Sequence, residues 1–121
     1  IQAIGLPRKE YFIWHDDTEY SLRINKLSRM LNVNTAGLDH KRKVGASDIH
    51  DWKNFYGFRN ELDLFKKYSP KQYYKELVKM MIRIIEAKKA KDDRLVKIYS
   101  AALKANLSGK FGVNTEFLPG K

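Results

Sequence analysis

The spacing of apolar residues after Ser69 constrains the fold of this chain more than any other feature. The segment Ser69-Pro70-Lys71-Gln72 predicts a helix start, with serine at the cap, proline at the first helical position and glutamine placed for a capping box. Apolar residues then recur at helical spacing and predict a buried stripe of Tyr74, Leu77, Val78, Met81, Ile84 and Ile85, widened by Tyr73 and Met80. The basic stretch Lys88 to Lys91 is expected to end this helix.

A last helix is expected directly after that basic stretch. Asp92 or Asp93 can cap its start, and Gly109 provides the left-handed residue on which helices commonly end. Its predicted inward face consists of Leu95, Ile98, Tyr99, Ala102 and Leu103. Two helices joined by so short a link pack against each other, so the sequence predicts a C-terminal antiparallel hairpin.

The first half of the chain predicts two further helices. One is capped by Asp17 or Thr18 and is supported by a Glu19–Arg23 pair; the other begins at Asp48 after a Ser47 cap. Gly57 is expected to bend or break the second helix before its stripe continues to Tyr68. The expected apolar positions are Tyr20, Ile24, Leu27 and Leu31 in the first helix and Ile49, Trp52, Phe55, Tyr56, Phe58, Leu62 and Phe65 in the second.

These patterns predict a mainly α protein, a small bundle of four to five helices with a C-terminal antiparallel helical hairpin. The expected organisation is an extended arm over residues 1–16, a single helical domain over 17–108 and an extended tail over 109–121. The chain has no cysteine, so packing must supply its stability. Apolar runs such as Met80 to Ile82 are far shorter than the roughly 20 residues of a transmembrane helix.

The charge of the chain indicates an anionic partner. The net charge is +10 and the isoelectric point is about 9.8. Most of the excess lies in the second half, where residues 61–121 hold fourteen bases and seven acids. Such a balance is unusual for an ordinary soluble enzyme and favours nucleic acid, anionic lipid or an acidic protein surface as the partner.

Four bases at intervals of four are the best candidates for contacting that partner. Lys71, Lys75, Lys79 and Arg83 are predicted to form one positive ridge on the helix that begins at Pro70. Like charges at this spacing cost a helix a few tenths of a kcal/mol per pair in water, which favours a partner that neutralises them. The alternative is an ordinary solvated helix face. Further bases expected to join the ridge are Lys66, Lys67, Lys88, Lys89, Lys91, Arg94 and Lys97.

A separate segment carries a local resemblance to a known family. Leu27, Ser28, Leu31, Val33 and Leu38 match the apolar and small positions of a helix-turn-helix, and the segment Leu27 to Leu38 resembles that motif of repressor-like DNA-binding proteins. The resemblance implies that residues of the range 34–43 enter a major groove. It places Thr35, Asp39, His40 and Arg42 near base edges. Independently of the resemblance, the basic run Lys41, Arg42 and Lys43 is a further candidate for contacting a polyanion.

No pattern of catalytic residues is present. His15, His40 and His50 do not share a helical face, so no metal site is expected. The acid pairs 16–17 and 92–93 each stand where a helix begins, and capping accounts for both. No glycine-rich phosphate-binding loop occurs. The sequence therefore predicts a non-enzymatic protein without cofactor or metal.

Together these observations favour a basic structural subunit that binds RNA, or another polyanionic surface, beside neighbouring protein subunits in a larger ribosome-like or organellar assembly. One alternative is a helix-turn-helix regulator that binds DNA; another is an accessory subunit of a respiratory complex or ATP synthase. The chain begins with Ile1 rather than Met. Removal of a mitochondrial presequence would explain this start, as would a fragment, and an intracellular location is expected.

Overall fold

The computed structural model describes residues 3–31, 33–37 and 51–120. Over these ranges the chain forms a short 3₁₀ helix, Lys9–Tyr11, and the helices α1 (Asp16–Leu27), α2 (Asp51–Tyr68), α3 (Pro70–Lys89) and α4 (Asp93–Leu107), with no strand. The predicted mainly α class is thereby confirmed. The predicted cap Ser47 and helix start Asp48 lie outside the described residues.

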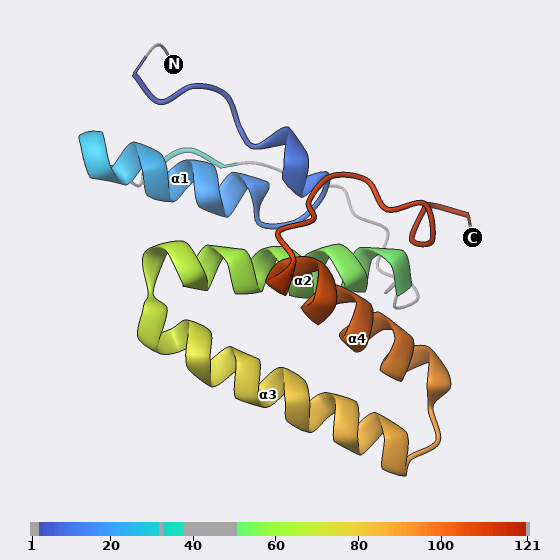
Figure 1. Ribbon diagram of the computed structural model, residues 1–121. Helices are drawn as coiled ribbons and strands as arrows, with labels where there is room; N and C mark the ends of the chain where they lie inside the picture. The colour runs from blue at the N-terminus through green and yellow to red at the C-terminus, as the bar shows by residue number, and fades with distance from the viewer. Residues whose placement is uncertain (1–2, 32, 38–50, 121) are drawn as a thin grey trace.

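The helix α2 occupies the centre of the molecule (Figure 1). The N-terminal arm, α1 and the C-terminal tail lie on one side of α2, and α3 lies on the other. The helices α2, α3 and α4 all contact one another, and α4 runs back along α3. The hydroxyl of Tyr73, near the start of α3, lies 3.5 Å from Oδ1 of Asn106, near the end of α4. The predicted antiparallel hairpin is therefore confirmed.

The ends of the hairpin follow the predicted sequence signals, with one exception. The helix α3 begins at Pro70 as predicted, but the expected capping box is absent because Ser69 makes no side-chain cap hydrogen bond. The Nε2 of Gln72 donates instead to Oε1 of Glu76, at 2.8 Å. Of the predicted signals, only proline therefore acts at this helix start. It has no backbone N–H that needs an acceptor, and its φ suits a helix.

The caps of α4 agree with the predictions at both ends. A carboxylate oxygen of Asp92 accepts a hydrogen bond from the backbone N–H of Leu95, at 3.0 Å. Gly109 has a φ of +66°, and the N–H of Lys110 donates to the carbonyl of Ala105, at 2.9 Å. This backbone bond pairs a carbonyl that the helix end would otherwise leave free.

The prediction that Gly57 bends or breaks α2 is wrong. The helix is continuous from Asp51 to Tyr68, and Gly57 is buried inside it. The indole ring of Trp14 lies against Gly57, where the Cβ of any other residue would overlap it. Glycine is therefore present to admit an aromatic ring of the N-terminal arm rather than to end the helix.

The core consists of two adjoining clusters formed by α2, the hairpin and one residue of the C-terminal tail. One contains Phe55, Tyr56, Ile98, Ala102 and Phe117, and the other contains Leu62, Tyr73 and Met80. The ring of Phe58 packs against both clusters and lies edge-on to Tyr99, with centroids 5.1 Å apart. The predicted inward faces of α2 and α4 are thus confirmed over the described residues.

The predicted buried stripe of α3 is wrong in four of its six members. Tyr74, Val78, Met81 and Ile85 are exposed, while only Leu77 and Ile84 are half-buried. The buried row of α3 is Tyr73, Met80 and Ala87 with Glu76, because α2 and α4 both contact the helix on that side. The sequence contains two apolar rows on α3. The fold buries the row of Tyr73, Met80 and Ala87 and leaves the predicted row exposed.

Both arms are attached to α2 by buried polar side chains. The guanidinium of Arg59 donates to the carbonyls of Glu10 and Tyr11 in the N-terminal arm and of Gly112 in the tail, at 2.7–3.3 Å. The ring of Phe117 stacks on Phe55, with centroids 4.3 Å apart. The described parts of the predicted arms therefore pack across the helical domain of their own chain.

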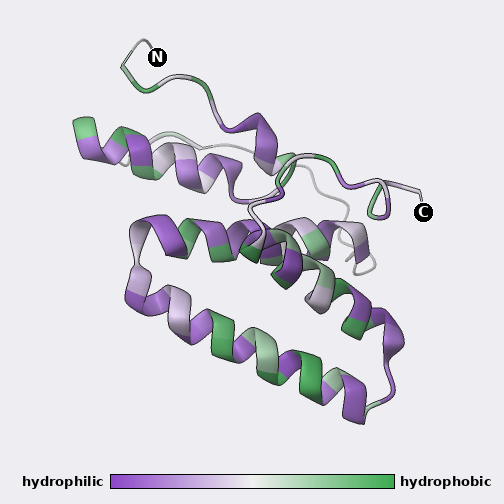
Figure 2. Cartoon of the chain, in the orientation of Figure 1, coloured by the Kyte–Doolittle hydropathy of each residue, from purple (hydrophilic) through white to green (hydrophobic). Residues whose placement is uncertain are grey.

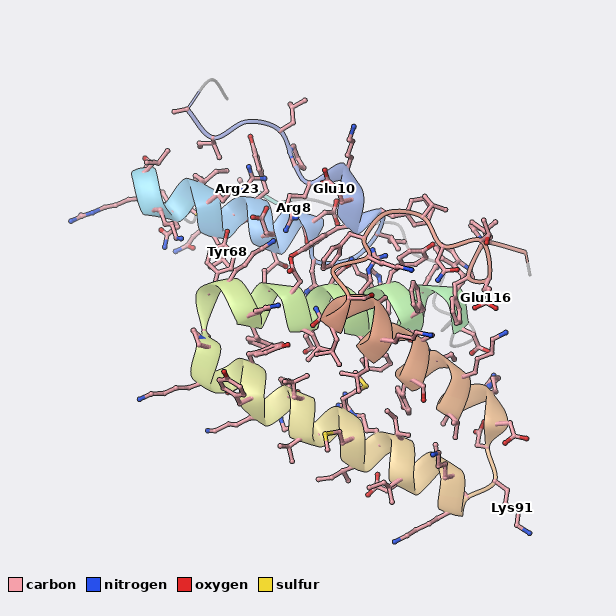
Figure 3. The ribbon with its side chains drawn as sticks, viewed as in Figure 1. Arg8, Glu10, Arg23, Tyr68, Lys91 and Glu116 are labelled. Atoms are coloured by element: carbon pink, nitrogen blue, oxygen red, sulfur yellow. The ribbon has the colours of Figure 1, made fainter. Side chains whose placement is uncertain are left out.

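The helix α1 is attached mainly by polar contacts. The predicted Glu19–Arg23 pair is present at 2.9 Å, and the hydroxyl of Tyr68 reaches Glu19 from the end of α2, also at 2.9 Å (Figure 3). The helix runs from Asp16 to Leu27 with His15 at its N-cap, so the predicted caps Asp17 and Thr18 are wrong, because both lie inside the first turn. Of its predicted stripe, Tyr20 and Ile24 are half-buried, whereas Leu27 and Leu31 are exposed.

The contact between Gly57 and Trp14 leads to a prediction about stability. In an ordinary helix Gly→Ala stabilises by about 1 kcal/mol. Here we expect Gly57→Ala to destabilise the protein by roughly 1–2 kcal/mol, because the new methyl group displaces the indole. In a Trp14→Ala background the same substitution should stabilise the protein. Urea unfolding of the four proteins tests this, and equal stabilisation in both backgrounds would contradict the contact.

Candidate polyanion-binding surface

The four predicted ridge residues lie on α3 but do not share one environment. A spacing of four residues exceeds the 3.6-residue turn, so each step along the row moves about 40° around the helix. The row therefore begins on the exposed side of α3 at Lys71 and reaches the edge of the core at Arg83. Lys71, Lys75 and Lys79 are exposed, and Arg83 is half-buried.

Lys71 and Lys75 form the most available part of the ridge. Neither ammonium makes a hydrogen bond or ion pair with a side chain of the described ranges. Both lie near the N-terminus of α3, whose first turn contains no acidic residue. The positive end of the helix dipole is therefore reinforced by Lys71 rather than neutralised. A lysine at the positive end of the dipole destabilises the helix when no ligand is bound, and it attracts anions.

Lys79 and Arg83 are partly engaged within the domain. The Nζ of Lys79 lies 2.7 Å from Oε1 of the buried Glu76, although 55% of the lysine side chain remains exposed. The hydrogen bond from Lys79 lowers the pKa of Glu76, against the opposing effect of burial. The guanidinium of Arg83 lies 5.3 Å from the ring centroid of Phe58, a cation–π arrangement with the core.

Two further predicted residues stand at the α2–α3 turn near Lys71. Lys66 is exposed, with its ammonium 5.9 Å from the ring centroid of Tyr73. Lys67 lies 2.6 Å from the buried carboxylate of Asp63, which also accepts hydrogen bonds from Arg8 and Tyr11. Lys67 thus helps to hold the N-terminal arm, whereas Lys66 extends the positive surface.

A second basic group surrounds the α3–α4 turn. Lys88, Lys89 and Lys91 are all exposed, and Lys91 projects from the outer edge of the molecule (Figure 3). From Lys71 to Lys89 the helix rises about 27 Å. The two basic groups therefore stand at opposite ends of α3, with Lys79 and Arg83 between them.

The structure does not bring Arg94 and Lys97 into the ridge. Arg94 lies 3.4 Å from Asp51 at the start of α2. The ammonium of Lys97 lies 5.9 Å from the ring centroid of Phe117 in the tail. Both side chains of α4 are therefore directed toward α2 and the tail rather than toward α3.

The segment that resembles a helix-turn-helix is described only in part. The helix α1 ends at Leu27, Ser28 is extended, and residues 33–37 contain a turn rather than a helix. Residues 38–43, which include Lys41, Arg42 and Lys43, lie outside the described residues. The resemblance stays a prediction.

The described ranges contain no group of three or more His, Cys, Asp or Glu residues that could hold a metal ion. A cleft of about 630 Å³ between α4 and the tail is lined by Arg59, Lys104 and Lys110. Arg59 is engaged there with backbone carbonyls, so it does not present a free guanidinium to a ligand. The exposed bases of α3 are the stronger candidate for binding.

Sequence reasoning missed one surface feature, the exposed apolar row of α3. Nine of the thirteen residues from Tyr73 to Ile85 are apolar or aromatic. This density exceeds what one buried stripe of a surface helix requires and could have indicated two apolar faces. Both rows fit the helical period, so the pattern does not tell which one faces α2 and α4.

Comparisons with protein-family models, with curated proteins and with solved structures found no match to this chain. None of the helices in the described ranges has the length and hydropathy that crossing a bilayer requires. Function is therefore inferred from the chemistry of the chain's own surface.

The pair between Glu76 and Lys79 should make stability depend on pH. The folded pKa of Glu76 lies below its ordinary value of 4.5, so its carboxylate stabilises the fold above that pH. This contribution is lost as the pH falls through the folded pKa. We expect Glu76→Gln to lower the unfolding free energy by about 1 kcal/mol at pH 7 and to have little effect in acid.

Urea unfolding at pH 7 and pH 3 measures this difference. Glu86→Gln is the matched control, because Glu86 is exposed on the same helix and forms no ion pair with the described residues. A pH-independent effect of Glu76→Gln would show that the charge of Glu76 does not contribute.

Proposed function

We propose that this protein is a non-enzymatic, basic structural subunit that binds the phosphate backbone of RNA through α3 within a larger ribosome-like or organellar assembly. The observation that carries the proposal is the exposure of Lys71 and Lys75 without a side-chain partner among the described residues, at a helix N-terminus without acids. An anion placed there gains both the two ammonium charges and the helix dipole.

The mechanism is backbone contact without sequence readout. Lysines act as point charges toward phosphate, and each neutralised phosphate releases condensed counterions. Lys66 extends the surface at one end of α3, and Lys88, Lys89 and Lys91 extend it at the other. A span of about 27 Å is long enough to meet several phosphates of one strand. Affinity should therefore fall steeply with salt.

Charge reversal of Lys71 and Lys75 tests the proposal. Lys79 and Arg83 are less suitable targets, because they also contact Glu76 and Phe58. We expect Lys71→Glu/Lys75→Glu to weaken binding of a fluorescein-labelled 20-nucleotide RNA by at least tenfold at low salt. The salt dependence should also lose about 1.5 units of slope, as two phosphate contacts disappear. Fluorescence anisotropy across a salt series measures both quantities.

Lys9→Glu/Lys110→Glu is the matched control. It changes the net charge equally, at two exposed residues that lie in the arms and not on α3. Equal losses in the two variants would mean that only net charge matters and would reject the α3 surface. Selection of one duplex DNA sequence, relaxed by Arg42→Ala, would support the helix-turn-helix alternative instead.

A substitution that should strengthen RNA binding provides a second test of the same surface. Glu76→Gln removes the carboxylate that holds Lys79, so the ridge gains one unneutralised charge. We expect tighter RNA binding and a salt slope steeper by about 0.7–0.9. The same anisotropy series measures it, with Glu116→Gln, at an exposed residue of the tail, as a comparison of equal charge. Unchanged binding in Glu76→Gln would exclude Lys79 from the contact.

A further inference from the structure

An apolar row runs along the exposed side of α3 next to the ridge. It consists of Tyr74, Val78, Met81 and Ile85, which are 67%, 55%, 54% and 52% exposed, and is called the seam below. In Figure 2 hydrophobic positions recur along the length of α3, at the side of the molecule farthest from the arms. Single exposed apolar residues are ordinary, but a continuous row of them indicates a surface that binds something.

The seam continues into a groove between α3 and α4. Ile84, Leu103 and Leu107 line this groove together with the short or basic side chains Ser100, Lys104 and Ser108. Ile84 is three residues from Met81, so it neighbours the seam on the helix surface. Leu107 is 60% exposed. The seam and the groove therefore form one apolar surface that is partly concave.

The spacing of the seam matches that of another helix. Its residues follow one another at intervals of four, three and four, the repeat that keeps a row of side chains facing a partner helix in a coiled coil. The row covers about 17 Å, roughly two heptads. A flat lipid surface would meet the row but leave the groove beside it empty, whereas side chains of a helix can fill that groove.

The charges around the seam indicate an acidic partner. Lys75 and Lys89 occupy the flanking positions that form ion pairs in coiled coils, Lys88 continues the seam one turn after Ile85, and Lys104 borders the groove. The acids of α3 are remote from this surface: Glu76 is buried against Lys79, and Glu86 stands on the ridge side. A second copy of the chain would bring lysines against lysines in an antiparallel pairing.

We propose that the seam and the groove bind an amphipathic α-helix of another protein, apolar along one face and acidic along its flanks. Lys79 and Arg83 lie farther around α3 than the seam. Lys75, Lys88 and Lys89 belong both to this surface and to the proposed RNA-binding surface, so RNA and the acidic helix should compete for these three lysines. The proposal is independent of the proposed RNA binding and is tested separately from it.

The probe is a fluorescein-labelled peptide of three heptads with leucine at positions a and d and glutamate at e and g. We expect saturable binding to the full chain in 0.15 M salt. A scrambled peptide of the same composition keeps its charge but loses the spacing, and it should bind at least tenfold more weakly. A peptide with lysine in place of glutamate should not bind detectably.

Substitutions that keep the net charge test whether the peptide binds at the seam. Val78→Gln/Met81→Gln should weaken binding of the acidic peptide at least tenfold, because both exposed residues lie at the centre of the seam. Leu6→Gln/Val113→Gln is the matched control, since it removes two exposed apolar side chains from the arms. Neither variant changes the net charge, so RNA affinity should be unaltered in both.

Several results would overturn the proposal. Equal binding of the scrambled peptide, or equal losses in the two variants, would mean that the seam does not recognise a helix. Binding to phosphatidylserine vesicles, or dimerisation in sedimentation, that Val78→Gln/Met81→Gln abolishes would assign the seam to lipid or to a second copy. Loss of RNA affinity in that variant alone would assign it to RNA. Failure of RNA binding in the unmodified protein, with peptide binding intact, would reject only the proposed function.

Discussion

The fold depends on how the buried guanidinium of Arg59 is satisfied. This side chain is 1% exposed, and a charge at such a depth is costly unless it is fully hydrogen-bonded. Its partners are backbone carbonyls of Glu10, Tyr11 and Gly112, together with the side chain of Asn60. The cation therefore requires both arms to lie on α2 at once, so the arms belong to the folded domain rather than being appended to it.

The position of the arms determines which surface is left for binding. With the arms and α1 on one side of α2, the hairpin must supply the core on the other side (Figure 1). The helix α3 then contacts its neighbours through the buried row of Tyr73, Met80 and Ala87 and through the half-buried Leu77 and Ile84 beside it, while its opposite side is exposed. The ridge and the seam are consequences of this arrangement, because no other described element covers them.

Local signals in the sequence predicted the helices well and their environment less well. Pro70, Asp92 and Gly109 act within one turn of themselves, so the ends of the hairpin could be placed without knowledge of the fold. Whether Gly57 interrupts α2 depends on Trp14, which is distant in sequence. Which apolar row of α3 is buried depends on where α2 and α4 lie, and helical periodicity contains no such information.

Three rows of residues lie on α3: the buried row, the seam and the ridge. The spacing of each row determines how it runs along the helix. The buried row repeats every seven residues and the seam every three or four, so both stay nearly in line with the helix axis. The ridge repeats every four residues and winds from solvent to the edge of the core. A helix that only packed against α2 and α4 would need neither the exposed seam nor the exposed ridge. An exposed basic row and an exposed apolar row on one helix are therefore the two observations on which the proposals of RNA binding and of helix binding rest.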